Sequence, residues 1–273
     1  MVVTSGSVEV QAETPIATRS RRRVPRPFAA AVAVSWVAIA AAELSGHGSI
    51  LHHDAIVESR TPVLAVATFL VAWQAMIGAM MLPSTLPMLS LFGVAAAAHP
   101  RRRRANVLVV SGYLAVWTGF GALALTFDLG VHRTVDRSVW LTDHSWIVAA
   151  ATLLVAGGFQ FTPLREQCMR ACRHPVAYLM HHYRPGLRGA FALGVRHGLF
   201  CLGCCWALML LMFGVGLTNL VWMGALTAVM VYEKVGRRGE ALARGVGIVL
   251  LLWGALVAVQ PAWLPHVLSG RLS

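Results

Sequence analysis

Three of the five cysteines fall within one short apolar run, where they share a helical face with other soft ligands. Steps of three or four residues give a stripe of His197, Cys201, Cys204, Cys205, Met209 and Met212. Thiol, thioether and imidazole groups without carboxylates select Cu(I) or Zn²⁺ over Mg²⁺ and Ca²⁺. The stripe therefore predicts a metal site, with copper favoured and zinc or iron as alternatives. The competing interpretation is that buried cysteines only pack as small apolar residues.

Methionines at helical spacing occur in two further apolar segments. Met76, Met80 and Met81 precede Pro83, and a later segment carries Met230 followed by Glu233. Methionine is also an ordinary filler of irregular cores, so either group alone is typical of packing. Because the residues lie at comparable depth in their segments, we expect three helices to bring sulfur to one layer, with Met209 and Glu233 among the metal ligands.

A short polar segment between two apolar runs carries Cys168 and Cys172, one helical turn apart, with His174 close behind. Two thiolates and an imidazole facing the cytoplasm would accept or hand over a metal ion, which predicts a relay. An amphipathic interfacial helix whose cysteines pack on lipid explains the same pattern, and both interpretations stay open. Histidines in the predicted outer loops (His47, His52, His53, His132 and His144) fit solvation as well as metal binding.

The composition places these segments in a membrane. The chain of 273 residues is 57% hydrophobic and only 12% charged, which excludes disordered and coiled-coil classes. Seven apolar runs predict transmembrane helices at 28–44, 62–98, 106–127, 145–161, 189–213, 217–232 and 241–259. The second run is too long for one straight crossing, so we expect a kink at Pro83 and a tail along the inner surface. The fold class is thus an all-α polytopic membrane bundle.

The basic residues that give the net charge of +12 are distributed as expected for such a bundle. Most of the basic residues lie before the first run and in alternate loops, which is the positive-inside pattern. It predicts a multi-pass protein of the cell (inner) membrane with the N-terminus inside and the C-terminus outside. Topology explains the arginine runs without nucleic acid, so we expect no nucleic-acid partner.

The expected organisation is a disordered Arg-rich tail at 1–27, one transmembrane domain at 28–263 and a short outer tail at 264–273. The first run is read as an uncleaved span, although an export signal fits its basic flank. Expected partners are the bilayer and a soluble protein that delivers or accepts metal. The oligomeric state is not predicted.

Four ordered motifs resemble those of a bacterial family known as predicted metal-binding integral membrane proteins. They are Trp73 with Met76 and Ala79-Met80-Met81-Leu82-Pro83, then Phe161 to Arg165 with Cys168, Cys172 and Pro175, then Gly194, His197, Cys201 and Gly203-Cys204-Cys205-Trp206, and Met230 with Glu233-Lys234. The resemblance covers about residues 62–259, and Arg165 stands where we expect lysine in relatives. It implies metal binding without naming the metal or an activity.

Three functions remain open from the sequence. The favoured one is an integral membrane protein that moves Cu(I) or holds it for a partner. The alternatives are a subunit of a metal-dependent membrane oxidoreductase or oxygenase, and a metal-free membrane subunit. No catalytic residues are assigned, because no catalytic triad, phosphate loop or dinucleotide fingerprint occurs in the sequence.

Overall fold

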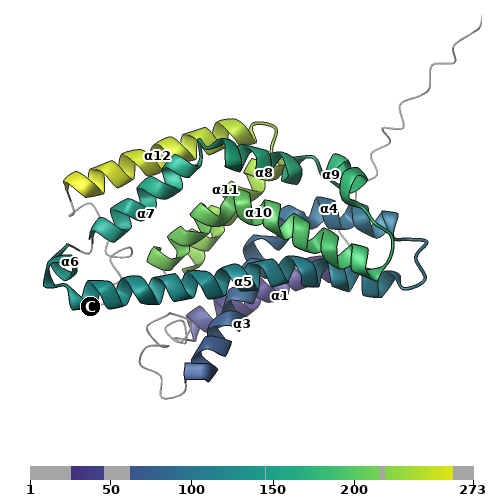
Figure 1. Ribbon diagram of the computed structural model, residues 1–273, viewed down its shortest axis with the longest axis horizontal. Helices are drawn as coiled ribbons and strands as arrows, with labels where there is room; N and C mark the ends of the chain where they lie inside the picture. The colour runs from purple at the N-terminus through teal and green to yellow at the C-terminus, as the bar shows by residue number, and fades with distance from the viewer. Residues whose placement is uncertain (1–25, 46–61, 145, 216–218, 261–273) are drawn as a thin grey trace, which may run out of the picture.

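The computed structural model describes residues 26–45, 62–144, 146–215 and 219–260, and every regular element in these ranges is an α-helix. The helices are α1 (Arg26–Leu44), α3 (Pro62–Met80), α4 (Leu82–Ala95), α5 (Arg102–Arg137), α6 (Val139–Asp143), α7 (Trp146–Phe159), α8 (Pro163–Arg173), α9 (Pro175–His182), α10 (Leu187–Val215), α11 (Leu220–Val235) and α12 (Gly239–Val259). Figure 1 shows them as one elongated bundle of long and short helices.

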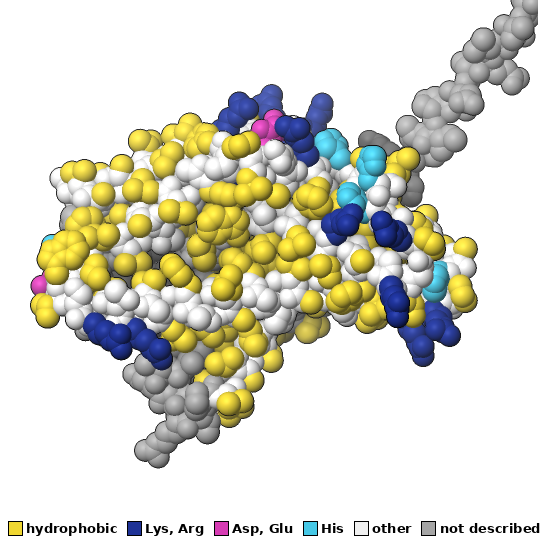
Figure 2. Space-filling view, viewed as in Figure 1, with side chains coloured by type: hydrophobic (Ala, Val, Ile, Leu, Met, Phe, Trp, Pro, Cys, Tyr) yellow, Lys and Arg dark blue, Asp and Glu magenta, His cyan; other side chains and the backbone are white. Residues whose placement is uncertain are grey.

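Five helices (α1, α3, α5, α10 and α12) are long and apolar enough to cross a membrane. The pair α7 and α8 adds a sixth if its bend of 62° lies within one span. Helix α11 has 16 residues and rises only about 24 Å, short of a ~30 Å hydrocarbon core. In Figure 2, apolar side chains cover the middle of the visible face while basic side chains gather towards its edges. The all-α apolar bundle is confirmed, and the count of seven spans stays a prediction.

Helix α5 is much longer than the apolar run that predicted it. The expected span was 106–127, whereas the helix has 36 residues and rises about 54 Å. Apolar periodicity marks where a helix is buried, but backbone hydrogen bonds continue through polar residues until a capping residue ends them. That residue is Ser138, whose hydroxyl accepts a hydrogen bond from the Leu141 amide at the start of α6. His132, expected in an outer loop, therefore lies in the last turns of α5.

The long second run is broken as its prolines predict. Helix α3 ends at Met80 and α4 begins at Leu82, so Pro83 occupies the first turn of α4, where its missing amide proton costs nothing. The Ala79 carbonyl, which a proline four residues later leaves without an intrahelical donor, accepts a hydrogen bond of 3.1 Å from Trp36 Nε1 of α1. A hydrogen bond from α1 thus satisfies the carbonyl that the break between α3 and α4 leaves free.

Glycines allow α5 and α10 to pack in close contact along their length. A Cβ atom on Gly194 would lie 2.0 Å from the Val109 carbonyl oxygen, and one on Gly112 would lie 2.4 Å from the Phe191 carbonyl oxygen. Only glycine permits such backbone contact. Helix α10 also packs on α8 and α7, and α12 packs on α7. The cysteine-bearing helix is therefore fixed between neighbours from both halves of the chain.

We expect Gly194→Ala to lower the free energy of unfolding by about 1–3 kcal/mol, because its Cβ would push two backbones apart. Gly119→Ala on α5 is the matched control, since a Cβ there meets no atom within 4 Å. The control should leave stability unchanged or raise it by up to about 1 kcal/mol. Thermal unfolding of the detergent-solubilised protein measures both, and equal midpoints for the two variants would contradict this packing.

Candidate metal-handling site

Four cysteine thiols from α8 and α10 lie next to one another. Cys204 Sγ is 3.3 Å from Cys205 Sγ and 3.9 Å from Cys172 Sγ. Cys201 Sγ interacts with the other three thiols, and Cys204 Sγ donates a hydrogen bond of 3.1 Å to the Cys201 carbonyl. We call these four residues the thiol cluster. Cys172 is half-buried, while the three thiols of α10 are fully buried.

A lysine ammonium and a tyrosine hydroxyl contact this cluster. Lys234 Nζ of α11 is 3.1 Å from Cys201 Sγ and donates a second hydrogen bond, of 3.0 Å, to Ser84 Oγ of α4. The Tyr113 hydroxyl of α5 is also 3.1 Å from Cys201 Sγ. All of these side chains are buried. Helices α5, α10 and α11 therefore meet at the Cys201 sulfur, and α4 is joined to them through the hydrogen bond between Lys234 and Ser84.

A buried ion pair lies one residue away from Lys234. Arg165 Nη2 donates a hydrogen bond of 2.7 Å to Glu233 Oε2, and both side chains are almost completely buried. The second carboxylate oxygen, Oε1, has no hydrogen-bond partner among the described residues. Arg173 of α8 bonds to the Gly236 carbonyl and to Glu240. These contacts join α8, which carries Cys172, to the end of α11 and the start of α12.

The predicted methionine ligands lie in the same buried cluster of side chains as the α10 cysteines. Met76, Met80, Met81, Met209 and Met230 are all at most 2% exposed. Helix α3 packs mainly on α1 and α5, however, and α10 mainly on α5 and α8. Helices α3 and α10, which we expected to bring sulfur to one layer, are thus linked chiefly through α5 and α11.

His197 lies one turn before Cys201, between the rings of Tyr113 and Tyr178 at centroid distances of 5.9 and 5.2 Å. It is buried, and its Nδ1 atom has no hydrogen-bond partner among the described residues. Tyr178 of α9 donates a hydrogen bond to the Leu193 carbonyl, and burial raises the pKa of its phenol, so the ring stays neutral. The imidazole thus has a free nitrogen in an aromatic setting beside the thiols.

Of the three residues expected in the cytoplasmic relay, only Cys172 belongs to the thiol cluster. Cys168 Sγ packs on Gly203 of α10, where an added Cβ would lie 2.5 Å from it. His174 is exposed at the junction of α8 and α9. Both cysteines face α10, because the buried side of the amphipathic helix α8 carries them. His47, His52 and His53 lie outside the described residues.

Lys234 and Tyr113 contact the cluster, and Ser84 bonds to Lys234, although the ligand stripes included none of these three residues. An ionisable residue within an apolar helix indicates a functional site, and Lys234 is such a residue. A serine and a tyrosine in apolar helices carry no comparable signal. In the parts of the chain that the structure describes, no three His, Cys, Asp or Glu side chains are arranged so as to hold a metal ion. The arrangement is a close group of soft donors beside one fixed cation.

Arg165→Gln should lower the free energy of unfolding by about 3–5 kcal/mol, because it leaves the buried Glu233 carboxylate without a counter-ion. Arg170→Gln on the same helix is the control, since its pair with Glu166 is exposed to solvent and its loss should leave stability nearly unchanged. Adding Glu233→Gln to Arg165→Gln should restore part of the loss. Unfolding in detergent measures all three variants, and equal effects of the two arginine substitutions would contradict a role for burial.

Comparison with known proteins identifies the family. A family model described as PpoB2, copper chaperone, matches residues 70–257, a range that contains the thiol cluster, Lys234 and the buried methionines. No curated protein and no solved structure matches the chain. Because the match spans more than half of the sequence, the chain belongs to the PpoB2 copper chaperone family.

Proposed function

We propose that this protein binds Cu(I) at the thiol cluster within a membrane and passes the ion to a partner protein. The observation that carries the proposal is the contact of four thiols inside a core rich in methionine, in a member of a copper chaperone family. Thiolate and thioether ligands favour Cu(I). Glu233, the one carboxylate expected among the ligands, pairs instead with Arg165, so the proposed ligand set lacks the carboxylates that harder ions prefer. The ion is therefore cargo, held by Cys201, Cys204 and Cys205, with Met209, Met76, Met80, Met81, Met230 and His197 as further donors.

The charge beside the cluster supports a monovalent cargo. The Lys234 ammonium lies 3.1 Å from Cys201 Sγ in a buried setting. Coulomb repulsion between this ammonium and a bound ion is twice as large for Zn²⁺ or Cu²⁺ as for Cu⁺ at the same distance. In a low-dielectric interior that difference is far larger than in water. Lys234 thus adds selection by charge to the selection by softness that the thiols provide.

Cys172 is the residue suited to pass the ion out of the cluster. It is the one half-buried thiol of the four, and its sulfur lies 3.9 Å from Cys204 Sγ. Ligand exchange would move Cu⁺ from the Cys204 thiolate to the Cys172 sulfur, and the proton that the Cys172 thiol loses would pass to the vacated Cys204 thiolate. The copper stays Cu(I) throughout, so the step needs no oxidant or reductant. An acceptor thiol of a soluble partner would then compete for the ion at Cys172.

We infer that the bundle lies in the cell (inner) membrane with its N-terminus in the cytoplasm. The five apolar helices of membrane length and the concentration of arginines in alternate loops support this placement. In that orientation α8 and Cys172 lie at the cytoplasmic side, where thiols stay reduced and available for metal transfer.

The triple variant Cys201→Ser, Cys204→Ser and Cys205→Ser should reduce the copper bound per purified chain to background, because it removes the three buried thiols. Cys168→Ser is the control, since this thiol packs on Gly203 outside the cluster and should leave copper content unchanged. Elemental analysis of detergent-purified protein after anaerobic loading with Cu(I) measures both. Unchanged copper in a triple variant that still elutes as a single species would overturn the proposal.

Cys172→Ser should keep the copper content but slow transfer to a soluble acceptor. We expect the transfer rate to fall by roughly tenfold or more, the size of effect typical of a lost residue around a metal site. The measurement is stopped-flow absorbance with a Cu(I)-specific chelator added to the loaded protein. A rate equal to that of the wild type would exclude Cys172 from the route, while Cys168→Ser reports any effect of α8 itself.

A further inference from the structure

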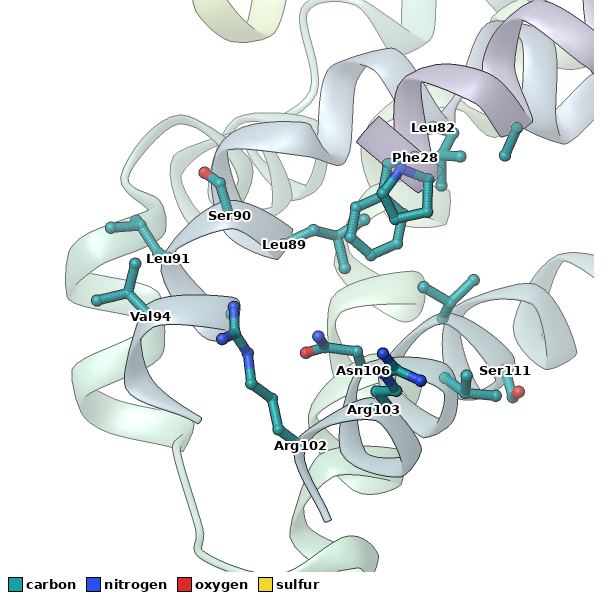
Figure 3. Close-up of a pocket in the computed structure, with 15 residues that line it drawn as sticks. Phe28, Leu82, Leu89, Ser90, Leu91, Val94, Arg102, Arg103, Asn106 and Ser111 are labelled. Carbon is teal, nitrogen blue, oxygen red and sulfur yellow. The ribbon is translucent and has the colours of Figure 1, made fainter. Parts of the chain in front are cut away.

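A cavity unrelated to the thiol cluster lies between α1, α4 and α5. Its volume is about 1100 Å³. The lining is mostly apolar and comes from three helices, with Phe28 of α1, Leu89 and Val94 of α4, and Val107 and Val110 of α5 among its apolar members. In Figure 3, Phe28, Leu82 and Leu89 lie across the cavity from Arg102. The cavity thus has an apolar side and a basic side.

The basic side carries two guanidinium groups. Arg102 extends its side chain towards the cavity between Val94 and Asn106, and Arg103 lies beside Asn106 (Figure 3). No acidic side chain occurs among the described residues that line the cavity. Guanidinium groups match phosphate geometry through paired hydrogen bonds, and the Asn106 amide adds a neutral donor. The chemistry at this side fits an anionic phosphate ester.

The dimensions fit one lipid chain. Residues 102 to 111 of α5 rise about 14 Å along the cavity, close to half of a ~30 Å hydrocarbon core. The aliphatic side chains of Leu89, Val94, Val107 and Val110 line this length. A molecule with an anionic head at the arginines and a hydrocarbon tail along these side chains would satisfy both sides of the cavity.

We propose that this cavity is a binding site for an anionic phospholipid, with the phosphate at Arg102 and Arg103 and one acyl chain along α4 and α5. The arginine run that opens α5 is predicted to face the cytoplasm, where anionic lipids are enriched and attract basic segments. The chain's own N-terminal segment is a poor occupant, because its run Arg21-Arg22-Arg23 has the same charge as the cavity. The site goes beyond copper handling, since no cysteine or methionine lines it.

The test of the head-group contact uses full-length detergent-solubilised protein and native mass spectrometry, with dioleoyl phosphatidylglycerol and dioleoyl phosphatidylcholine as probes. The wild type should retain the anionic lipid in preference to the zwitterionic one. Arg102→Gln with Arg103→Gln should weaken that binding by on the order of tenfold. The control is Arg101→Gln with Arg104→Gln, which removes the same charge from arginines outside the cavity lining and should change binding by less than about twofold.

The test of the acyl-chain contact fills the cavity without touching the arginines. A Cβ on Gly93 meets no atom within 4 Å, so Gly93→Trp places an indole in the cavity without a backbone clash. We expect this variant to lose the bound phosphatidylglycerol. Gly130→Trp on α5 is the control, because that glycine also has open space but lies outside the cavity lining.

Three results would overturn the lipid site. They are equal retention of the two lipids by the wild type, equal effects of the two arginine pairs, and retained phosphatidylglycerol in Gly93→Trp. A cavity occupied by a second copy of the chain would instead give a dimer that Gly93→Trp dissociates and added lipid does not affect. Copper content after Cu(I) loading should be unchanged in all these variants, so failure of the lipid site and failure of copper binding are read separately.

Discussion

The arrangement depends on satisfying buried charge at the end of α11. Glu233 and Lys234 are consecutive and nearly inaccessible, and a charge in such a setting destabilises the fold unless it has a partner. Glu233 pairs with Arg165 of α8, whereas Lys234 bonds to Ser84 of α4 and to Cys201 of α10. Two neighbouring residues therefore fix three other helices. Cys172 is brought to Cys204 because α8 is held at the same point.

The helix breaks and close contacts serve the same geometry. The interruption at Met81 puts Pro83 in the first turn of α4 and places Ser84 within reach of the Lys234 ammonium. Backbone contact at Gly194 holds α10 against α5, so the Tyr113 hydroxyl reaches Cys201. A soft cation entering the cluster would meet donors whose positions are already set by these contacts. That preorganisation suits the copper binding and transfer that we propose.

Much of the fold could be predicted from the sequence, because a long apolar helix corresponds to an apolar run of similar length in the sequence. Apolar runs gave the positions of α1, α3, α7, α10 and α12 to within a few residues, and the proline pair predicted the break after Met80. The extent of α5 could not be predicted, since helical hydrogen bonding continues beyond the residues that are buried. The sixth run predicted α11. Its 16 residues are too few to show by length alone whether it crosses a membrane.

At the site, the sequence alone determined which donors are available: a stripe of thiols, an imidazole and thioethers on α10, and methionines beside a helix break. Only the tertiary structure decided which of them meet. Cys168 and Cys172 are both thiols on the same face of α8, one turn apart. Cys168 nevertheless packs on Gly203, whereas Cys172 contacts Cys204. Lys234 joins Cys201 across 33 positions of sequence. The physical reason is that a helical period fixes the neighbours within a helix, whereas contacts between helices follow from the partners that buried charges and glycine surfaces require.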